Sequence, residues 1–193
     1  MRHVISLMHM SLDGFVAGPN GEMDWIRIDD EIFSYVDRFI DSADTAFYGP
    51  KTFGMMESHW PKVLRDPQAS GHQLVHARWY ERAEKLVFSR ELDMLDNKHV
   101  KLVRQNLASE VAELKQRPGK NIVILGSPGL VQSFSKLVLI DEFVITINPV
   151  ILGGGIPMFK GIDLRIGLHL AGSTQFKSGV IGAHYIRREL VSA

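Results

Sequence analysis

Residues 121–134 read NIVILGSPGLVQSF, an apolar segment that runs directly into a glycine turn and then into a helical pattern. A strand of uninterrupted apolar residues is typical of a parallel sheet that is covered on both faces. Ser127 stands where the helix would begin, and Pro128 suits the first helical position because the N–H that proline lacks would have no partner there. The stretch therefore predicts one strand–turn–helix unit of an α/β protein.

A second unit of this kind lies at residues 45–60, where the short buried strand TAFYG precedes a helix that Pro61 is expected to end. Elsewhere the apolar residues follow the period of a strand or of a helix. The pattern predicts strands at 3–10, 84–89, 99–103, 121–125 and 142–150, helices at about 30–42 and 109–116, and closing strands at 168–176 and 180–190. Residues 61–80 and 153–165 show no regular pattern and are expected to be irregular. The sequence therefore predicts an α/β fold in a single domain, residues 1–193, with a mostly parallel mixed sheet, helices on both faces and a C-terminal antiparallel hairpin.

The composition excludes several classes of protein. With 193 residues, 45% of them apolar, the chain can bury a full core. It has no cysteine, which excludes disulfides, thiolate nucleophiles and cysteine-bound zinc, and suits a reducing cytoplasm. No cleavage site follows the first strand and no apolar stretch approaches the roughly 20 residues that cross a bilayer, so we expect a soluble cytoplasmic protein without a signal peptide. Lys and Arg number 22, as do Asp and Glu, and no basic cluster stands out, so neither nucleic acid nor a membrane is an expected partner.

Two glycine turns are candidate anion sites. YGPKT at residues 48–52 and LGSPGL at 125–130 each lie between a predicted strand and the start of a helix. Glycine lets a phosphate approach the backbone, and the free N–H groups and dipole of a helix N-terminus favour negative charge. Neither turn matches the GxGxxG dinucleotide pattern, and a strand-to-helix turn needs glycine for steric reasons in any case. Two such turns in one α/β sheet favour a ligand site beyond the carboxyl ends of the strands.

Carboxylates near the second element are the candidate acid groups. Asp29, Asp30 and Glu31 begin the helix at about 30–42, close to Trp25. Helix capping and a favourable dipole interaction explain two of the three. A carboxylate beside an indole also suits a proton donor, or an anchor for an amidine-like ring edge. Asp13 lies in the segment SLDG, where a turn-forming role is the simpler interpretation.

Other chemistry finds less support in the sequence. His72 and His76 are four residues apart, but no acidic third ligand lies in their segment, so we expect two surface histidines and no metal site. Serine, histidine and aspartate all occur, but the GxSxG elbow of many hydrolases does not. A metal centre and a hydrolytic triad are therefore not expected.

The order of five motifs resembles the bacterial dihydrofolate-reductase-like family, and more narrowly the reductase domain of riboflavin biosynthesis and its stand-alone relatives. The motifs are SLDGFVAGPNGEMDW at 11–25, FYGPKTF at 47–53, VFSR at 87–90, ILGSPGLVQSF at 124–134 and ITINPVILGGGIPMF at 145–159. The resemblance covers nearly the whole chain. It implies a three-layer dihydrofolate-reductase-like fold, a homodimer, and an NADPH-dependent reductase that transfers a hydride to a small planar substrate. That substrate would be a pterin or a pyrimidine similar to 5-amino-6-(5-phosphoribosylamino)uracil. Dihydrofolate reductase proper and a nucleotide-binding module without turnover are the alternatives.

The resemblance also implies which residues hold the cofactor. Val16 and Ala17 match a mobile loop that closes over the nicotinamide, and Ser89 and Arg90 match the strand end beside the adenosine ribose. The residues that match the phosphate-binding turns are Gly49, Lys51, Thr52, Gly126, Ser127, Pro128, Gly129, Leu130 and Val131. Pro50 replaces an arginine that is usual in the first of these turns, which removes a donor for the 2′-phosphate of NADPH.

For the substrate, the resemblance implies contacts with Trp25, Phe33 and Thr146. It points to two different carboxylates. Asp30 matches the acidic group that binds the pteridine edge in dihydrofolate reductases, whereas the riboflavin-type reductases favour Asp13 instead. We expect Asp30 to orient the substrate or relay the proton that accompanies hydride transfer, with Asp13 as its rival.

Overall fold

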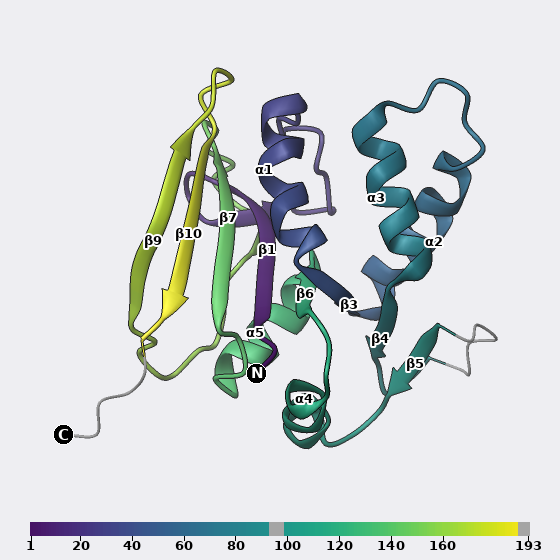
Figure 1. Cartoon of the computed structure of the whole chain (residues 1–193). Coiled ribbons are helices and arrows are strands. Elements are labelled where there is room, and N and C mark those ends of the chain that lie inside the picture. Colours follow the sequence, from purple (N-terminus) through teal and green to yellow (C-terminus); the bar gives the residue numbers. More distant parts are fainter. Residues whose placement is uncertain (93–98, 189–193) are drawn as a thin grey trace.

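The computed structural model describes residues 1–92 and 99–188, which form an α/β fold around one large sheet (Figure 1). The sheet has eight strands in the order β5-β4-β3-β6-β1-β7-β10-β9. They are β1 (Val4–Ser11), β3 (Ala43–Tyr48), β4 (Glu84–Phe88), β5 (Val100–Val103), β6 (Asn121–Leu125), β7 (Glu142–Asn148), β9 (Leu168–Gln175) and β10 (Ile181–Arg187). A separate two-stranded sheet joins β2 (Phe15–Ala17) to β8 (Ile156–Pro157).

The strand directions match the prediction of a mostly parallel sheet with a terminal hairpin. β1 pairs in parallel with β6 on one side and with β7 on the other, and β3, β4 and β5 continue the parallel part. β10 runs antiparallel to β7 and to β9. The hairpin turn closes where the Gly179 N–H donates to the Phe176 carbonyl, inside the predicted turn region.

Helices cover both faces of the sheet because successive strand residues point to opposite sides. Ile5 packs in one core with α1 (Asp30–Asp41), α2 (Pro50–Val63) and α3 (Gly71–Arg82). Val4, the preceding residue, packs in a second core with α4 (Leu107–Gln116) and α5 (Pro128–Lys136). The predicted three-layer arrangement is therefore confirmed. In the part of the chain that is described, no helix is both long enough and apolar enough to span a membrane.

Two predictions about the region after β3 are wrong. α2 continues through Pro61 to Val63, because only the last turn of the helix follows the proline and a single backbone hydrogen bond is lost. Residues 61–80, which were expected to be irregular, contain most of α3. Its start carries a capping box, in which the Ser70 hydroxyl accepts from the Gln73 N–H and the Gln73 side chain accepts from the Ser70 N–H.

His76 on α3 is not a surface residue, contrary to the prediction. Its ring stacks on Trp60 with the centroids 3.9 Å apart and meets Trp79 edge-on. Desolvation in this aromatic environment, together with the nearby charge of His59, lowers the pKa of His76 to about 4. The ring is therefore neutral at physiological pH and contributes to the packing between α2 and α3.

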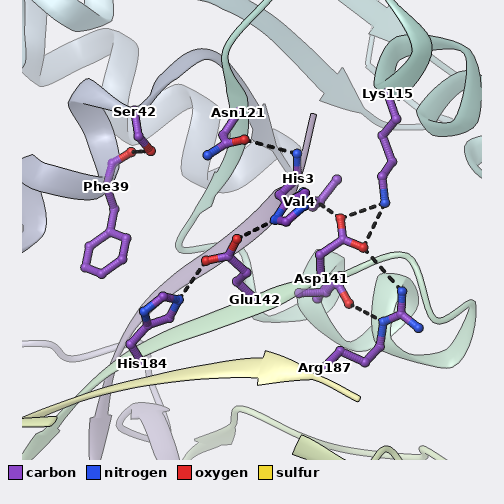
Figure 2. Close-up of polar contacts among 11 residues, drawn as sticks. His3, Val4, Phe39, Ser42, Lys115, Asn121, Asp141, Glu142, His184 and Arg187 are labelled. Carbon is purple, nitrogen blue, oxygen red and sulfur yellow. Dashed lines mark hydrogen bonds and ion pairs between the residues drawn. The ribbon is translucent and has the colours of Figure 1, made fainter. Parts of the chain in front are cut away.

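The amino ends of the central strands are held by a network of charged groups (Figure 2). Glu142 lies between two histidines, with one carboxylate oxygen 2.6 Å from His3 Nδ1 and the other 2.6 Å from His184 Nε2. The neighbouring Asp141 accepts from the Lys115 ammonium and the Arg187 guanidinium. These contacts fasten α4, β7, β10 and the residue before β1 together at one end of the sheet. The carboxyl ends of the strands lie at the opposite end.

Candidate functional site

A groove of about 560 Å³ opens at the carboxyl ends of β3, β4, β5 and β6. This is the position where ligands bind in open α/β sheets. The lining residues come from both glycine turns and from the segments that follow β4 and β5: Gly49, Pro50, Lys51, Thr52, Phe88, Ser89, Arg90, Val103, Arg104, Leu107, Ser127, Pro128, Gly129, Leu130, Ser133 and Ile156.

The two glycine turns that line the groove contact each other. The Gly49 N–H donates to Ser127 Oγ at 2.8 Å, so this hydroxyl bridges the turns instead of capping its own helix. Gly126 has φ +64°, and a Cβ there would lie 3.3 Å from the Thr52 methyl carbon. The close contact requires a residue without a side chain at position 126. It also brings the N-termini of α2 and α5, with their free N–H groups and positive dipole ends, to one groove.

The charged side chains that line the groove in the described structure are all cationic. Lys51, Arg90 and Arg104 line it, and no aspartate or glutamate does so among the residues that the structure describes. None of these three cations forms an ion pair within residues 1–92 and 99–188. An anionic ligand is therefore favoured here by side-chain charge as well as by the two helix dipoles.

The segment expected near the nicotinamide lies in the small sheet beside this groove. Val16 and Ala17 are buried in β2, which pairs with β8. Ile156 of β8 reaches the groove wall, and the Gln132 side chain on α5 donates to the Pro157 carbonyl at 2.8 Å. The small sheet is thus attached to the helix that carries the second glycine turn.

Asp13 ties the loop after β1 to the loop after β7. Its carboxylate accepts from the Ser11 hydroxyl at 2.7 Å and from the backbone N–H groups of Leu152 and Gly153 at 3.1 and 2.8 Å. Partial desolvation would raise the pKa of Asp13, but these hydrogen bonds outweigh it and hold the pKa below its usual value. The group is therefore ionised at physiological pH and engaged on both oxygens.

Asp30 lies in a different environment at the N-terminus of α1. Asp29 caps the helix by accepting from the Ile32 N–H at 2.9 Å, which leaves Asp30 exposed and without a side-chain hydrogen bond in the described part of the chain. The Arg27 N–H donates to the Asn148 side chain at 2.9 Å, which holds the segment before α1 against the carboxyl end of β7. Of the two candidate carboxylates, Asp30 is thus the one whose oxygens have no hydrogen-bond partner among the described residues.

The residues expected to face the substrate share the α1 side of the sheet but not one enclosed pocket. Phe33 stacks on His72 with the ring centroids 5.9 Å apart, and the indole N–H of Trp25 donates to the Glu22 carbonyl. Thr146 is buried, and its hydroxyl pairs with Nδ1 of His9. Desolvation lowers the pKa of His9 to about 4, so its ring is a neutral hydrogen-bonding partner of Thr146.

Sequence reasoning found most of the groove but not all of it. Nine of the thirteen expected cofactor residues line it. Of the other four, Gly126 lies against Thr52, Val16 and Ala17 lie in the small sheet, and Val131 packs in the hydrophobic core. Val103 and Arg104 were missed, although they stand at the end of a strand that pairs in parallel with β4. The rule that parallel strands end at one edge of a sheet would have placed them beside Ser89 and Arg90.

Comparison with known proteins identifies relatives of this chain. A family model described as the RibD C-terminal domain matches residues 2–182. The uncharacterized protein YyaP of Bacillus subtilis (strain 168) is 37% identical over 186 residues, which are 95% of this chain and 94% of YyaP.

Solved structures share the fold at lower sequence identity. The "Putative riboflavin biosynthesis protein" of Shewanella sp. PV-4 has a TM-score of 0.76 and 23% identity, and the match covers 97% of this chain and 99% of that one. Dihydrofolate reductase from Enterococcus faecalis, complexed with NADP(H), has a TM-score of 0.63 and 13% identity, with 97% of both chains covered.

A third solved structure is longer than this chain. The deaminase/5-amino-6-(5-phosphoribosylamino)uracil reductase of Thermotoga maritima has a TM-score of 0.66 and 17% identity, and the match covers 97% of this chain but 57% of that enzyme. The predicted dihydrofolate-reductase-like fold is therefore confirmed by three proteins of that architecture. Together with the matched family model and the 37% identity to YyaP, it shows that this chain belongs to the RibD C-terminal domain family.

Proposed function

We propose that the chain is an NADPH-dependent reductase that delivers a hydride to a small planar heterocycle, a pyrimidine of the riboflavin-pathway type or a pterin. The observation that carries this proposal is the groove in which two helix N-termini and three cationic side chains converge, with no carboxylate among the described residues that line it. Such a groove fits a dinucleotide with several phosphates. When bound, the nicotinamide supplies the hydride, and the protein supplies binding, orientation and a proton.

Each part of the site has a defined task in this proposal. In the turns at Gly49–Thr52 and 126–130, the backbone N–H groups of Lys51, Thr52, Ser127 and Gly129 hold the pyrophosphate. The side chains of Lys51 and Arg90 neutralise charge toward the adenosine end. Val16 and Ala17 on β2 exclude water from the nicotinamide side. Asp30 orients the substrate ring or relays the proton that accompanies hydride transfer.

The relatives support the proposed substrate class. The Thermotoga enzyme is named for reduction of a phosphoribosylamino pyrimidine, and the Enterococcus enzyme is named for dihydrofolate. The family match favours the pyrimidine type over the pterin type. Dihydrofolate reductase proper is therefore the second candidate, and a nucleotide-binding module without turnover is the third.

The test is the substrate-dependent oxidation of NADPH, followed by absorbance, with a phosphoribosylamino pyrimidine, with dihydrofolate and with a panel of pterins. We expect oxidation with the pyrimidine or another small planar heterocycle. Faster oxidation with dihydrofolate would favour the second candidate. NADPH binding without oxidation of any substrate would favour the module, and the absence of binding would refute the proposal.

We also propose that the protein is a homodimer. Ile151, Phe159 and Leu170 are 70%, 45% and 54% exposed, and a second copy of the chain would cover apolar surface of this kind. β9 pairs with β10 alone in the described structure, so its other edge offers unpaired backbone groups. Sedimentation at micromolar concentration should show a species of about twice the mass of one chain. A single species with the mass of one chain would refute the dimer.

A further inference from the structure

We infer that a cavity between α1 and the β9–β10 hairpin is a second ligand site, which binds a small aromatic carboxylate. The cavity has a volume of about 580 Å³ and is lined in part by residues at the amino ends of β1, β6 and β7. It shares no lining residue with the groove at the carboxyl ends of the strands. The inference is therefore independent of the proposed function.

The shape of the cavity suits a flat ring. Gly172 on β9 lines it, and a Cβ at this position would meet no atom within 4 Å, so the backbone is bare on this side. The opposite wall includes Phe39 of α1, whose ring meets the His184 ring edge-on with the centroids 5.1 Å apart (Figure 2). An aromatic ligand can pack between the exposed backbone of β9 and the aromatic side chains of α1.

A buried hydroxyl that lines the cavity has no hydrogen-bond partner. Tyr35 on α1 is 5% exposed, and its hydroxyl forms no hydrogen bond with the residues that the structure describes. Its ring is held in place, because it packs edge-on against Phe39 and Phe176 and lies close against the backbone of Gly182. Buried polar groups normally have a partner, since leaving one unpaired costs free energy. We expect a ligand in the cavity to supply the missing partner.

Two further donor groups line the cavity without an acceptor. The Asn121 side-chain oxygen accepts from the His3 N–H at 3.1 Å, whereas its amide nitrogen has no partner in the described part of the chain. Arg38 on α1 is exposed, and its guanidinium carbon lies 5.0 Å from the centroid of the Tyr35 ring and 6.0 Å from that of Phe39. These ring contacts restrain the guanidinium but use none of its N–H groups. The unused groups call for a ligand with acceptor oxygens.

The charges around the cavity favour an anion. Glu142 is 9% exposed, and its two carboxylate oxygens each lie 2.6 Å from an imidazole nitrogen, of His3 and of His184 (Figure 2). The acid is thus matched by donors from the protein itself. Arg38 is the charged lining side chain that has neither an ion pair nor a hydrogen bond within residues 1–92 and 99–188. A carboxylate can bind a guanidinium through two parallel hydrogen bonds, which completes the assignment of an aromatic acid.

The experiment titrates the isotope-labelled protein with 2-naphthoate and follows its amide signals by NMR. We expect saturable binding, with the largest changes at residues 171–174 and at His184. The isosteric amide, 2-naphthamide, should bind about tenfold more weakly because it lacks the charge. The corresponding amine, 2-(aminomethyl)naphthalene, should bind more weakly still.

Three variants test the named residues. Arg38→Gln should weaken 2-naphthoate about tenfold and remove its advantage over the amide. Tyr35→Phe should weaken both ligands without lowering the melting temperature, because the hydroxyl has no partner in the free protein. Gly172→Leu should fill the cavity and abolish binding of both, and the open space around Gly172 lets the variant fold.

A matched control distinguishes the cavity from the cationic groove. Arg104 lines the groove and not the cavity, so Arg104→Gln should leave the affinity for 2-naphthoate unchanged. The inference fails if Arg104→Gln weakens 2-naphthoate while Arg38→Gln and Gly172→Leu do not, because the acid then binds in the groove. It also fails if the amine binds as tightly as the acid, or if no saturable binding occurs at millimolar concentration. The proposed function stands in each of these cases, since NADPH binding is measured separately.

Discussion

Replacing Asp30 with asparagine is expected to lower the turnover of the best substrate by about 100-fold or more, because a carboxyl group that bound substrate positions as the general acid contributes at least that factor. Asp30 is the carboxylate at the start of α1 that neither caps the helix nor forms a side-chain hydrogen bond in the described residues. The substitution preserves size and shape, so the dissociation constant of NADPH and the melting temperature should stay close to those of the wild type. Steady-state kinetics give the turnover, and calorimetry gives the affinity.

Asp13→Asn is the matched comparison for this experiment. The lowered pKa of Asp13 means that the carboxylate supports its two loops above that pKa and loses this role as the pH falls through it. The asparagine retains one acceptor oxygen for the Leu152 and Gly153 N–H groups, so a moderate loss of loop order is expected, with a smaller effect on turnover. If Asp30→Asn is silent and Asp13→Asn abolishes turnover, the riboflavin-type assignment of Asp13 is right and ours is wrong. If both variants are silent, the two carboxylates act only in the turn and at the helix end.

Gly155→Ala is expected to be the most destabilising single-methyl change in the site. Gly155 has φ +140°, and a Cβ would lie 2.2 Å from the Ala17 carbonyl oxygen, which is backbone and cannot rotate away. Strain of this kind costs about 3 kcal/mol of the free energy of unfolding, which corresponds to a melting temperature roughly 6–12 °C lower. Because β2 must move to relieve the contact, the affinity for NADPH should fall as well. Differential scanning calorimetry and cofactor titration measure the two effects.

The neighbouring Gly154 provides the control for this change. Its Cβ would meet nothing within 4 Å, and its φ is not in the positive region. Gly154→Ala should therefore leave the melting temperature and the NADPH affinity close to wild type. Equal behaviour of the two alanine variants would show that β2 and β8 do not need their close contact.

The sequence predicts an element well where burial makes its pattern simple. Residues 121–125 are predicted as a strand because β6 is covered on both faces and needs an uninterrupted apolar run. α3 was missed because its buried residues include His76, Trp79 and Tyr80, which have polar atoms and do not stand out as an apolar stripe. The capping box at Ser70 and Gln73 was the available signal.

In the site, the features that depend on neighbouring residues were predicted, whereas those that depend on contacts between distant segments were missed. The glycine turns were found because strand, glycine and helix start are adjacent in sequence. The Gly49–Ser127 hydrogen bond and the hydrogen bonds from Arg104 to the Arg90 and Leu92 carbonyls join segments that are not adjacent in the chain. A single sequence carries no periodic trace of such pairs. The resemblance implied a cofactor contact for Arg90, but nothing in the motifs pointed to Arg104 as a residue of the groove.

The position of β1 in the middle of the sheet has a consequence for synthesis of the chain. Val4 pairs with Ile122 and Ile5 with Glu142, so β1 leaves the ribosome well before either of its partner strands. Such long-range pairings give a high contact order and slow folding. Until β6 and β7 are synthesised, an apolar strand stays open to other chains. We therefore expect the nascent protein to be most prone to aggregation before β6 and β7 have been synthesised.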